Sequence, residues 1–236
     1  MNIDYLLTKH SLFQGIPQKE IPQLLQILDT YIKEYYSNEY IVLEGKSIKF
    51  IGVVLKGTIS MQKEDYWGNN YVYTEINDNN IFGETFIDTI TQKSTVSYMA
   101  LTKCKILFIR YNSIIHPIRP YEYQQIIIDN LISLQAKKNR LLMEKLEIVT
   151  KYSLRQRILT FLNQQMEKHQ NETIHLRMSQ QELANYLCVN RSSMLRELKR
   201  MQQEGFIHYD RTTITLNKVN DIQSSLHNKH HESEEL

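Results

Sequence analysis

Arginine, serine and lysine side chains near the carboxyl-terminal end of the sequence have the types and spacing needed to contact DNA. Arg191, Ser192, Arg196 and Lys199 lie within little more than two turns of an expected helix. A guanidinium group can donate two parallel hydrogen bonds to O6 and N7 of guanine, whereas a lysine ammonium group is suited to phosphate. We therefore expect Arg191 to contact a guanine, Arg196 a base or a phosphate, and Lys199 a phosphate.

The helix that carries these side chains must be positioned by its neighbours. Residues 179–201 are expected to form two short helices joined by a tight turn. Ser179 and Glu182 have the spacing of a capping box, which begins the first helix. Asn190 can cap the second helix by accepting a hydrogen bond from its first turn. Ser179 and Gln180, at the start of the first helix, complete the predicted set of DNA-contacting residues.

Apolar residues in this segment repeat at helical spacing, so each helix has one face suited to a core. Gly205 is expected to end the second helix. The β-rich runs at 206–209 and 213–216, with a turn at 210–212, complete a helix-turn-helix with a hairpin wing. The alternative is an ordinary helical pair with a solvated, charged face. The core face comprises Leu183, Ala184 and Leu187 in the first helix and Met194, Leu198 and Met201 in the second. Leu195 is expected on the opposite, outward-facing arc of the second helix, together with the DNA-contacting residues.

Composition favours a soluble protein of two modest domains. The chain has 236 residues, of which 42% are hydrophobic and 23% charged. No apolar run is long enough to span a membrane and no signal-peptide pattern is present, so we expect a cytoplasmic protein. The net charge is only +2, whereas residues 177–218 hold seven Lys or Arg and four Asp or Glu. The small basic excess lies where DNA phosphates would be contacted.

Cysteine and histidine usage argues against metal cofactors. Cys104 and Cys188 are the only cysteines, too few for an iron–sulfur cluster or a four-cysteine zinc site. We interpret them as two unpaired structural thiols. Residues 11–115 contain no histidine, which argues against haem ligation there and against metal enzymes built on a jelly roll. We expect no metal, no iron–sulfur cluster, no haem and no enzymatic activity.

The amino-terminal half changes from a helical pattern to a strand pattern. Residues 4–35 are expected to be helical, with a break at Gly15 and Pro17. Short β-rich runs between 39 and 109 then predict a β-sandwich or jelly-roll barrel. Asparagines are expected at turns, because the chain has only 7 glycines. The runs are 40–43, 50–55, 58–61, 71–74, 94–99 and 105–109, and the asparagines are Asn38, Asn69, Asn70, Asn79 and Asn80.

Residues 121–148 contain neither Gly nor Pro and predict one long helix. Ile127, Leu131, Leu134 and Leu141 repeat at spacings of four, three or their sum, an apolar seam suited to pairing with a second copy. The alternative is that this helix only packs on its own barrel. We expect an effector-sensing barrel domain with amino-terminal helices at 1–116, a dimerisation helix at 117–149, and a DNA-binding domain at 150–236 that opens with a helix at 151–169.

Five short motifs occur in order along the chain: Leu12–Ile16, Leu43–Gly45, Val54–Gly57, Ile81–Glu84 and Arg191–Arg196. Together they resemble the Crp/Fnr family of bacterial transcription regulators. The resemblance implies an α+β fold: an N-terminal jelly-roll β-barrel of the cyclic-nucleotide-binding kind, a long dimerisation helix and a C-terminal winged helix-turn-helix. It also implies a homodimer on an inverted repeat of double-stranded DNA, gated by a small effector in the barrel, with RNA polymerase as a further partner.

The sequence departs from the family in the implied effector pocket. Cyclic-nucleotide-binding members end their phosphate-binding segment in Arg-Ser or Arg-Thr, whereas this chain has Ser94-Thr95 without the arginine, and Lys93 is expected on the opposite face. A phosphate that lacks its bidentate partner is disfavoured, so we expect an effector other than cyclic AMP. The alternatives are a cyclic nucleotide held by Lys93 or Arg140, and a constitutive regulator without effector. The implied pocket comprises Phe82, Gly83, Glu84, Ser94, Thr95 and Arg140.

Two further departures concern the DNA-reading segment. Ser192 stands where the family often has Glu, so the preferred half-site should differ from those of the best-known members. Cys188 stands in the turn where the family usually has Gly. A left-handed backbone at Cys188 would cost about 1 kcal/mol, unless the turn relaxes.

Overall fold

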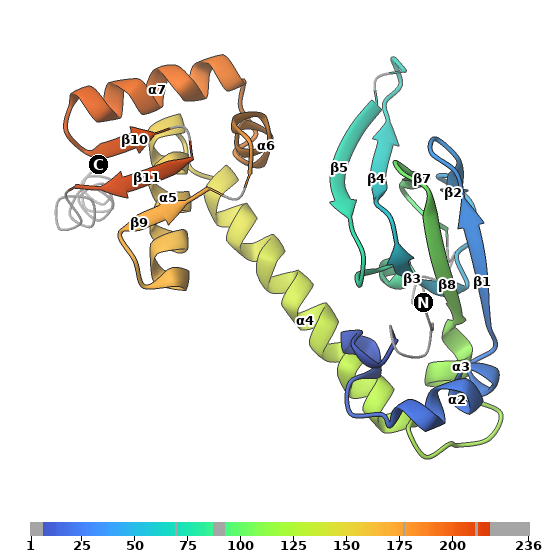
Figure 1. Ribbon diagram of the computed structural model, residues 1–236. Coiled ribbons are helices and arrows are strands. Elements are labelled where there is room, and N and C mark those ends of the chain that lie inside the picture. Colours follow the sequence, from blue (N-terminus) through green and yellow to red (C-terminus); the bar gives the residue numbers. More distant parts are fainter. Residues whose placement is uncertain (1–6, 69, 87–92, 177, 211, 218–236) are drawn as a thin grey trace, which may run out of the picture. The chain divides into compact units, whose positions relative to one another are not determined.

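The computed structural model describes residues 7–68, 70–86, 93–176, 178–210 and 212–217. The chain divides into two compact units, residues 1–136 and 137–236, each of which is described by itself (Figure 1). The division falls within the segment expected to be a separate dimerisation helix. The first unit is mainly β and the second mixes helices with a small sheet, which confirms the predicted α+β class.

The first unit contains two four-stranded antiparallel sheets. One has the strand order β1-β8-β3-β6 and the other β2-β7-β4-β5. Their facing apolar side chains form one continuous core, as predicted for a β-sandwich. The strands are β1 (Thr30–Tyr35), β2 (Tyr40–Val42), β3 (Phe50–Lys56), β4 (Ile59–Glu64), β5 (Asn70–Ile76), β6 (Ile81–Phe82), β7 (Ser97–Ala100) and β8 (Cys104–Arg110).

Aromatic rings fill the middle of this core. Phe108 contacts Phe50 edge to face, with ring centroids 4.6 Å apart, and Phe82 packs against Tyr98 at 4.9 Å. A Cβ atom at Gly52 would lie 2.1 Å from the Phe82 ring. Only glycine at position 52 therefore permits the Phe82 ring to approach β3 this closely. The contact fixes Phe82, which lies directly before the turn at Gly83.

The amino-terminal segment is less helical than predicted. Its described helices are η1 (Ser11–Phe13), η2 (Gln18–Glu20) and α2 (Ile21–Ile27). The prediction of helix up to residue 35 is wrong, because residues 30–35 form β1 and pair along their whole length with β8. Strand formation here depends on a partner far along the chain, which the local apolar spacing does not reveal. Residues 4–6 lie outside the described residues.

Turn predictions based on asparagine are only partly confirmed. Asn38 and Asn79 adopt the left-handed conformation, with φ of 68° and 61°. The prediction is wrong for Asn70, which begins β5. Asn69 lies outside the described residues. Asp29 and Gln170 take the same conformation, with φ of 49° and 51°, although neither was expected to.

The predicted long helix is α4 (Gln124–Val149), which follows the short helix α3 (Tyr111–Ile115). Ile127 and Leu131 are buried in the core of the first unit, and Leu134 packs against that core. Leu141 is exposed. Ile127 and Leu131 therefore have the alternative role, in which the helix packs on its own domain. The sequence could not distinguish the two roles, because both require the same apolar spacing.

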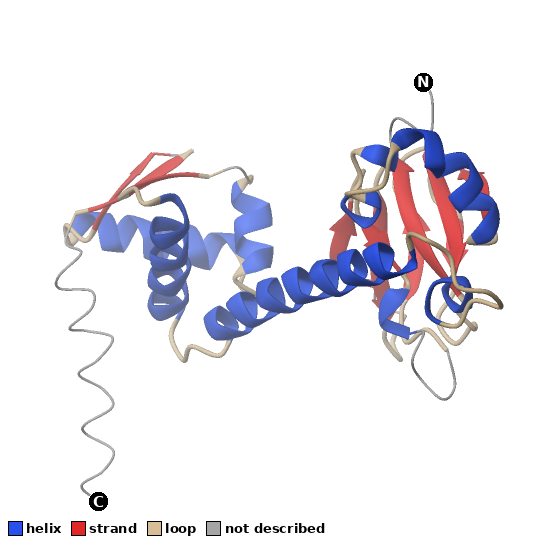
Figure 2. Cartoon of the chain, turned by 90° about the horizontal axis from the view of Figure 1, so that it is seen from below, coloured by secondary structure: helices blue, strands red, loops and turns tan. Residues whose placement is uncertain are grey.

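In the second unit, helices lie beside a small sheet (Figure 2). The sheet has the order β10-β11-β9, so the wing contains a third strand in addition to the two predicted. The third strand has only three residues and is defined by its pairing with β11. The elements are α5 (Leu154–His169), β9 (Thr173–His175), α6 (Gln180–Tyr186), α7 (Arg191–Gln203), β10 (Ile207–Asp210) and β11 (Thr213–Leu216).

The described part of the chain offers few sites for other chemistry. None of its helices is both long and apolar enough to cross a membrane. It also holds no group of three or more His, Cys, Asp or Glu side chains that could bind a metal ion. Cys104 is buried, Cys188 is exposed, and both are free thiols.

Candidate nucleic-acid interface

Helix α6 begins with the predicted capping box. The Ser179 Oγ accepts a hydrogen bond from the Glu182 N–H at 3.2 Å, and the Ser179 N–H donates to Glu182 Oε2 at 2.6 Å. The bond from Ser179 holds the pKa of Glu182 below its usual value. Leu183, Ala184 and Leu187 are buried, as predicted, so the polar start of the helix is held at the surface.

The turn after α6 keeps the geometry that a glycine would favour. Cys188 has a φ of 55°, in the left-handed region. Its N–H donates to the Asn185 carbonyl at 3.1 Å, and the Val189 N–H donates to the Ala184 carbonyl at 3.0 Å. This pair of bonds is a Schellman motif, which satisfies the last carbonyls of α6. The turn therefore does not relax, and Cys188 bears the backbone strain.

Helix α7 is docked by its apolar face. Met194, Leu198 and Met201 are fully buried, as predicted. At the end of the helix, Gly205 has a φ of 76° and forms a second Schellman motif with Phe206. The predicted cap is wrong in one respect: Asn190 occupies the N-cap position, but its side chain makes no capping hydrogen bond.

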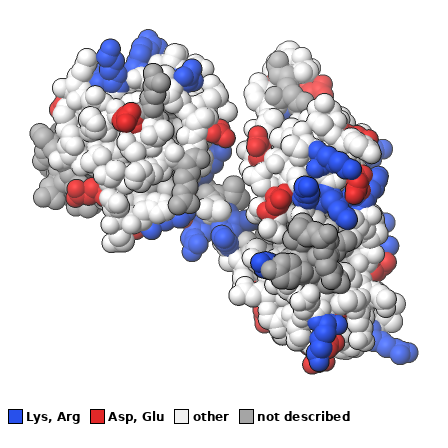
Figure 3. Space-filling model, in the orientation of Figure 1, with Lys and Arg blue, Asp and Glu red and all other residues white. Residues whose placement is uncertain are grey.

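The outward face of α7 carries the predicted DNA-contacting residues. Arg191, Ser192, Arg196 and Lys199 are all exposed. Lys and Arg side chains gather along the edge of the unit that α7 occupies (Figure 3). Leu195, expected on this arc, is instead half-buried and packs against the core.

A chain of hydrogen bonds connects the starts of both helices to the wing. The Arg191 Nη2 donates to Gln180 Oε1 at 2.6 Å, and the Gln180 Nε2 donates to Tyr209 Oη at 2.9 Å. An open depression of about 730 Å³ is lined by Ser179, Gln180, Gln181 and Arg191. Sequence reasoning found Gln180 and Arg191 but missed Tyr209, because no local pattern connects the wing to the helices.

Arg196 and Lys199 differ in how they are held. The Arg196 Nε and Nη2 lie 3.4 Å from the Ser192 carbonyl and the Ser193 Oγ, so this side chain lies along its own helix. Within the described part of the chain, Lys199 makes neither an ion pair nor a hydrogen bond. Both cationic groups are therefore free of acidic partners there.

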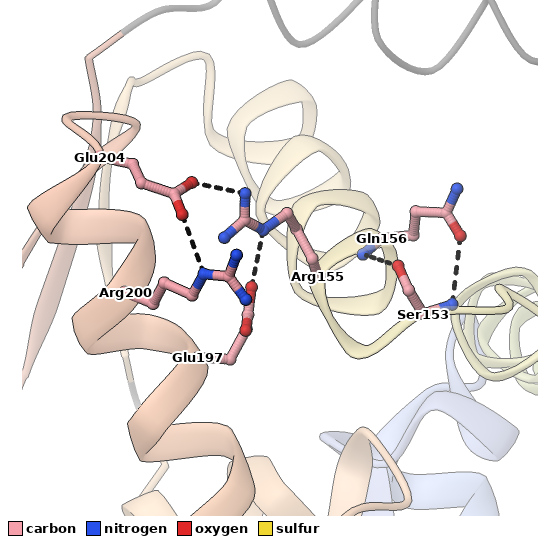
Figure 4. A network of polar contacts seen from close by, with 6 residues as sticks. All are labelled: Ser153, Arg155, Gln156, Glu197, Arg200 and Glu204. Atoms are coloured by element: carbon pink, nitrogen blue, oxygen red, sulfur yellow. Dashed lines mark hydrogen bonds and ion pairs between the residues drawn. The ribbon is translucent and has the colours of Figure 1, made fainter.

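The acidic residues near α7 are held by a clamp to α5 (Figure 4). The Arg155 Nε lies 2.6 Å from Glu197 Oε1, and its Nη1 lies 2.6 Å from Glu204 Oε2. Arg200 reaches the other oxygen of Glu204 at 3.0 Å. The hydrogen bond from Arg155 holds the pKa of Glu204 below its usual value, with a smaller contribution from Arg200. Arg155 also lies over the Phe206 ring, 5.6 Å from its centroid.

This clamp sorts the charges of α7 by face. Glu197 is the only acidic residue of the helix, and Arg155 draws it toward α5. The arginine itself is placed by α5, which begins with a capping box of Ser153 and Gln156 (Figure 4). Positive charge alone remains on the outward face, and the depression beside it is lined by polar side chains. Such a surface complements the phosphates and base edges of DNA.

The structure describes only part of the implied effector pocket. Phe82 is buried, Gly83 has a φ of 84°, and Glu84 opens the short helix η3 (Glu84–Phe86). Tyr98, which the sequence analysis missed, lies nearby; burial, and then the charge of Glu84, raise its pKa. Residues 87–92, between Glu84 and Ser94, lie outside the described residues.

Ser94 and Thr95 differ in exposure, and Arg140 belongs to the other unit. Ser94 is buried, and its Oγ donates to the Val96 carbonyl at 2.6 Å. Thr95 is exposed, as is Lys93 on the face opposite Ser94, which agrees with the strand alternation expected for Lys93. Arg140 belongs to the second unit and pairs with Glu144 at 3.9 Å.

Both parts of the chain match known domain families. Residues 32–118 match the cyclic nucleotide-binding domain, and residues 156–223 match the Crp-like helix-turn-helix domain. No curated protein sequence matches the chain.

Solved structures share the fold over most of the chain. CprK complexed with OCPA has a TM-score of 0.66 at 13% identity, over 87% of this chain and 93% of that chain. CooA from Carboxydothermus hydrogenoformans, in a mutant form, has a TM-score of 0.56 at 14% identity, over 86% and 89%. The c-di-GMP responsive global regulator CLP from Xanthomonas campestris has a TM-score of 0.52 at 19% identity, over 85% and 99%.

The two matched domains follow one another in the order that the sequence motifs predicted, and the second contains the exposed basic helix α7. At identities this low, the solved structures support the fold alone. The domain matches go further: the chain belongs to the Crp/Fnr family, whose members are DNA-binding transcription regulators and not enzymes.

Proposed function

We propose that this protein is a cytoplasmic homodimer that binds an inverted-repeat DNA site and is gated by a small effector other than cyclic AMP. The outward face of α7 is the observation that carries this proposal. It combines Arg191, the candidate base reader, with Arg196, a candidate for a base or a phosphate, and Lys199, a candidate for a phosphate. The only acidic residue of the helix is clamped to α5. A helix-turn-helix dimer places two such helices in major grooves about one helical turn apart, roughly 34 Å.

We assign dimerisation to a seam on α4 in which each predicted position is replaced by the residue that follows it. Ile132, Leu142 and Leu146 are 61%, 65% and 52% exposed. With Met143, they fall within an arc of about 100° on the helix, and Leu141 falls on the far side. Ile132, Leu142 and Leu146 belong to a series of positions spaced alternately by four and three residues, the pattern of a coiled coil. We call these positions the α4 seam: Ile128, Ile132, Gln135, Asn139, Leu142, Leu146 and Val149.

The proposal of an effector other than cyclic AMP rests on the end of the implied phosphate-binding segment. No arginine precedes Ser94, whose hydroxyl already donates to a backbone carbonyl, and Thr95 is exposed. Proteins with a similar fold support effectors of other kinds: CprK is complexed with OCPA, and CLP is c-di-GMP responsive. Two alternatives remain testable: a cyclic nucleotide held by Lys93 or Arg140, and a constitutive regulator.

Selection of bound DNA from a random pool, with and without a cell metabolite extract at fixed salt, tests the proposal. We expect an inverted repeat that is enriched only with extract. The same repeat without extract would support constitutive binding, and enrichment restored by purified cyclic AMP would support the cyclic-nucleotide alternative. Failure to enrich any motif in either condition would contradict sequence-specific binding. Transcription in vitro from the selected site would then test the expected contact with RNA polymerase.

A further inference from the structure

We propose that Tyr209, in the wing, is a positioning residue that sets base selectivity by orienting Arg191 through Gln180. The inference rests on the proposed function, because it requires Arg191 to contact a base. The three side chains come from β10, α6 and α7, and they are connected by bonds of 2.9 and 2.6 Å. Gln180 and Tyr209 are half-buried, whereas Arg191 is exposed at the outer end of the network.

The glutamine amide gives the network a direction. Its nitrogen can only donate and its oxygen can only accept hydrogen bonds. The Arg191 guanidinium can only donate, so the Gln180 Oε1 is turned toward it, and the Gln180 Nε2 donates to Tyr209 Oη at the other end of the amide. The reverse orientation would place an amide N–H₂ group against a cation that also only donates. The Tyr209 hydroxyl, which can donate or accept, takes the hydrogen bond from the Gln180 Nε2 and thereby holds the amide in place against Arg191.

The backbone of Tyr209 is fixed by the far end of α7. Its N–H donates to the Gln202 Oε1 at 3.0 Å, in the last turn of that helix. Ile207, two residues earlier in β10, is buried, and Tyr209 pairs with Ile214 of β11. The wing strand is thus tied to the end of α7 by its backbone and to the start of α7 through its side chain. This arrangement makes the position of Tyr209 independent of the exposed Arg191.

A restrained arginine is a more selective reader than a mobile one. A guanidinium group has five N–H donors, so one bond to Gln180 leaves others for O6 and N7 of guanine. The restraint lowers the conformational freedom that Arg191 would lose on binding, and it disfavours orientations that suit other bases. Tyr209 thereby acts on selectivity without contacting a base.

A double-mutant cycle on the full-length protein tests this role. The variants are Arg191→Ala, Tyr209→Phe and their combination. Affinity is measured on the selected site and on sites in which the guanine opposite Arg191 is replaced. Tyr186→Phe is the matched control, because it removes a tyrosine hydroxyl of the same unit outside the network. Gln180→Leu is a second probe, should Tyr209→Phe prove unstable in thermal melting.

We expect Arg191→Ala to lower the guanine preference about five- to a hundredfold, the range for one bidentate base contact. Tyr209→Phe and Gln180→Leu should each lower it about three- to tenfold, the range for one hydrogen bond, and should have no further effect in the Arg191→Ala background. Tyr186→Phe should leave the preference unchanged.

Three results would overturn the inference. An unchanged guanine preference in Tyr209→Phe and Gln180→Leu, with a reduced preference in Arg191→Ala, would remove the positioning role and leave the proposed function intact. Equal weakening on all sequences with an unchanged salt slope would make Tyr209 a neutral phosphate contact instead. If Arg191→Ala itself keeps the preference, the base-reading assignment fails, and the role of Tyr209 fails with it.

Discussion

Arg191 is the residue on which, under the proposed function, we expect sequence-specific binding to depend most. It begins α7, and residues at the start of a recognition helix face base edges. We expect Arg191→Ala to cost about 1–3 kcal/mol at one guanine-containing position of the half-site and little at others. Competition binding against single-base variants of the site measures this. Arg200→Ala is the control, because Arg200 pairs with Glu204 away from the outward face. Equal loss on every sequence would contradict the assignment.

Lys199 should behave differently, because an ammonium group serves as a phosphate contact. It is exposed on the outward face of α7, beyond the residues expected to reach bases. We expect Lys199→Ala to weaken binding to all sequences by a similar factor. The slope of log affinity against log salt should fall by about 1. A change confined to one base position, with an unchanged slope, would instead make Lys199 a base contact.

His10 makes the first unit sensitive to acid. Burial lowers its pKa from 6.5 to about 4, so the folded state holds the neutral ring. Because the pKa of His10 is lower in the folded than in the unfolded state, the unfolded state binds more protons between these two values. The stability linked to His10 is therefore complete above pH 6.5 and is lost as pH falls toward 4. The free energy of unfolding should therefore decrease by about 1.4 kcal/mol per pH unit across this range, roughly 3 kcal/mol in all.

His10→Asn isolates this contribution. The His10 Nδ1 accepts from the Leu12 N–H at 3.1 Å, and an asparagine oxygen can take that role without titrating. We expect the variant to be less stable at pH 7, because the ring leaves a cavity, but to lose the slope between pH 6.5 and 4. Denaturant unfolding at several pH values measures both. His208→Asn, at an exposed position, is the control. An unchanged slope in His10→Asn would contradict the explanation.

At the scale of elements, the clamp between α5 and α7 should stabilise the second unit. We expect Arg155→Met to lower the free energy of unfolding by about 1–3 kcal/mol, because it leaves Glu197 and Glu204 without their closest partner. Arg200→Met should have a much smaller effect, since the Arg200 side chain is 69% exposed and that of Arg155 is 29% exposed. Thermal and denaturant unfolding test both. Equal effects of the two variants would contradict the assigned roles.

The clamp also predicts a pH dependence. Because the folded pKa of Glu204 is lowered, the stabilisation is present above its unfolded pKa, near 4.5, and is lost as pH falls through the folded pKa. Arg155→Met should therefore flatten the loss of stability below about pH 4.5. An equally steep loss in the variant would place the acid sensitivity elsewhere.

Elements defined by local signals could be predicted from the sequence, and those defined by distant partners could not. The capping box of Ser179 and Glu182 lies within one turn, so α6 was found with its correct N-cap residue. Strand β1 was missed because its partner, β8, lies far along the chain. The same limit applies to the interface: Arg155 and Glu197 are 42 residues apart, and Gln180 and Tyr209 are 29 apart. Side-chain types revealed Arg191, but not the residues that hold it.

At the scale of the whole molecule, the question is which face of α4 joins two copies. A periodic pattern cannot distinguish a seam that packs internally from one that pairs with a second chain. Ile127 and Leu131 pack internally, and Ile128 packs against the same core. The exposed apolar positions of the α4 seam are Ile132, Leu142 and Leu146. Gln135 and Asn139 fall in the middle of the α4 seam, where polar residues fix register at some cost in stability.

Charge in the α4 seam should therefore separate the dimer. We expect Leu142→Lys combined with Leu146→Lys to give a monomer in analytical ultracentrifugation, because two cations would be buried against two others. Leu141→Lys is the matched control: Leu141 is 45% exposed, adjacent in sequence and on the far side of the helix. It should leave the dimer intact. A monomer from Leu141→Lys and a dimer from the double variant would instead place the dimer contact on the seam predicted from the sequence, which includes Leu141. Because two half-sites are read together only by a dimer, the double variant should also lose its preference for an inverted repeat over a single half-site.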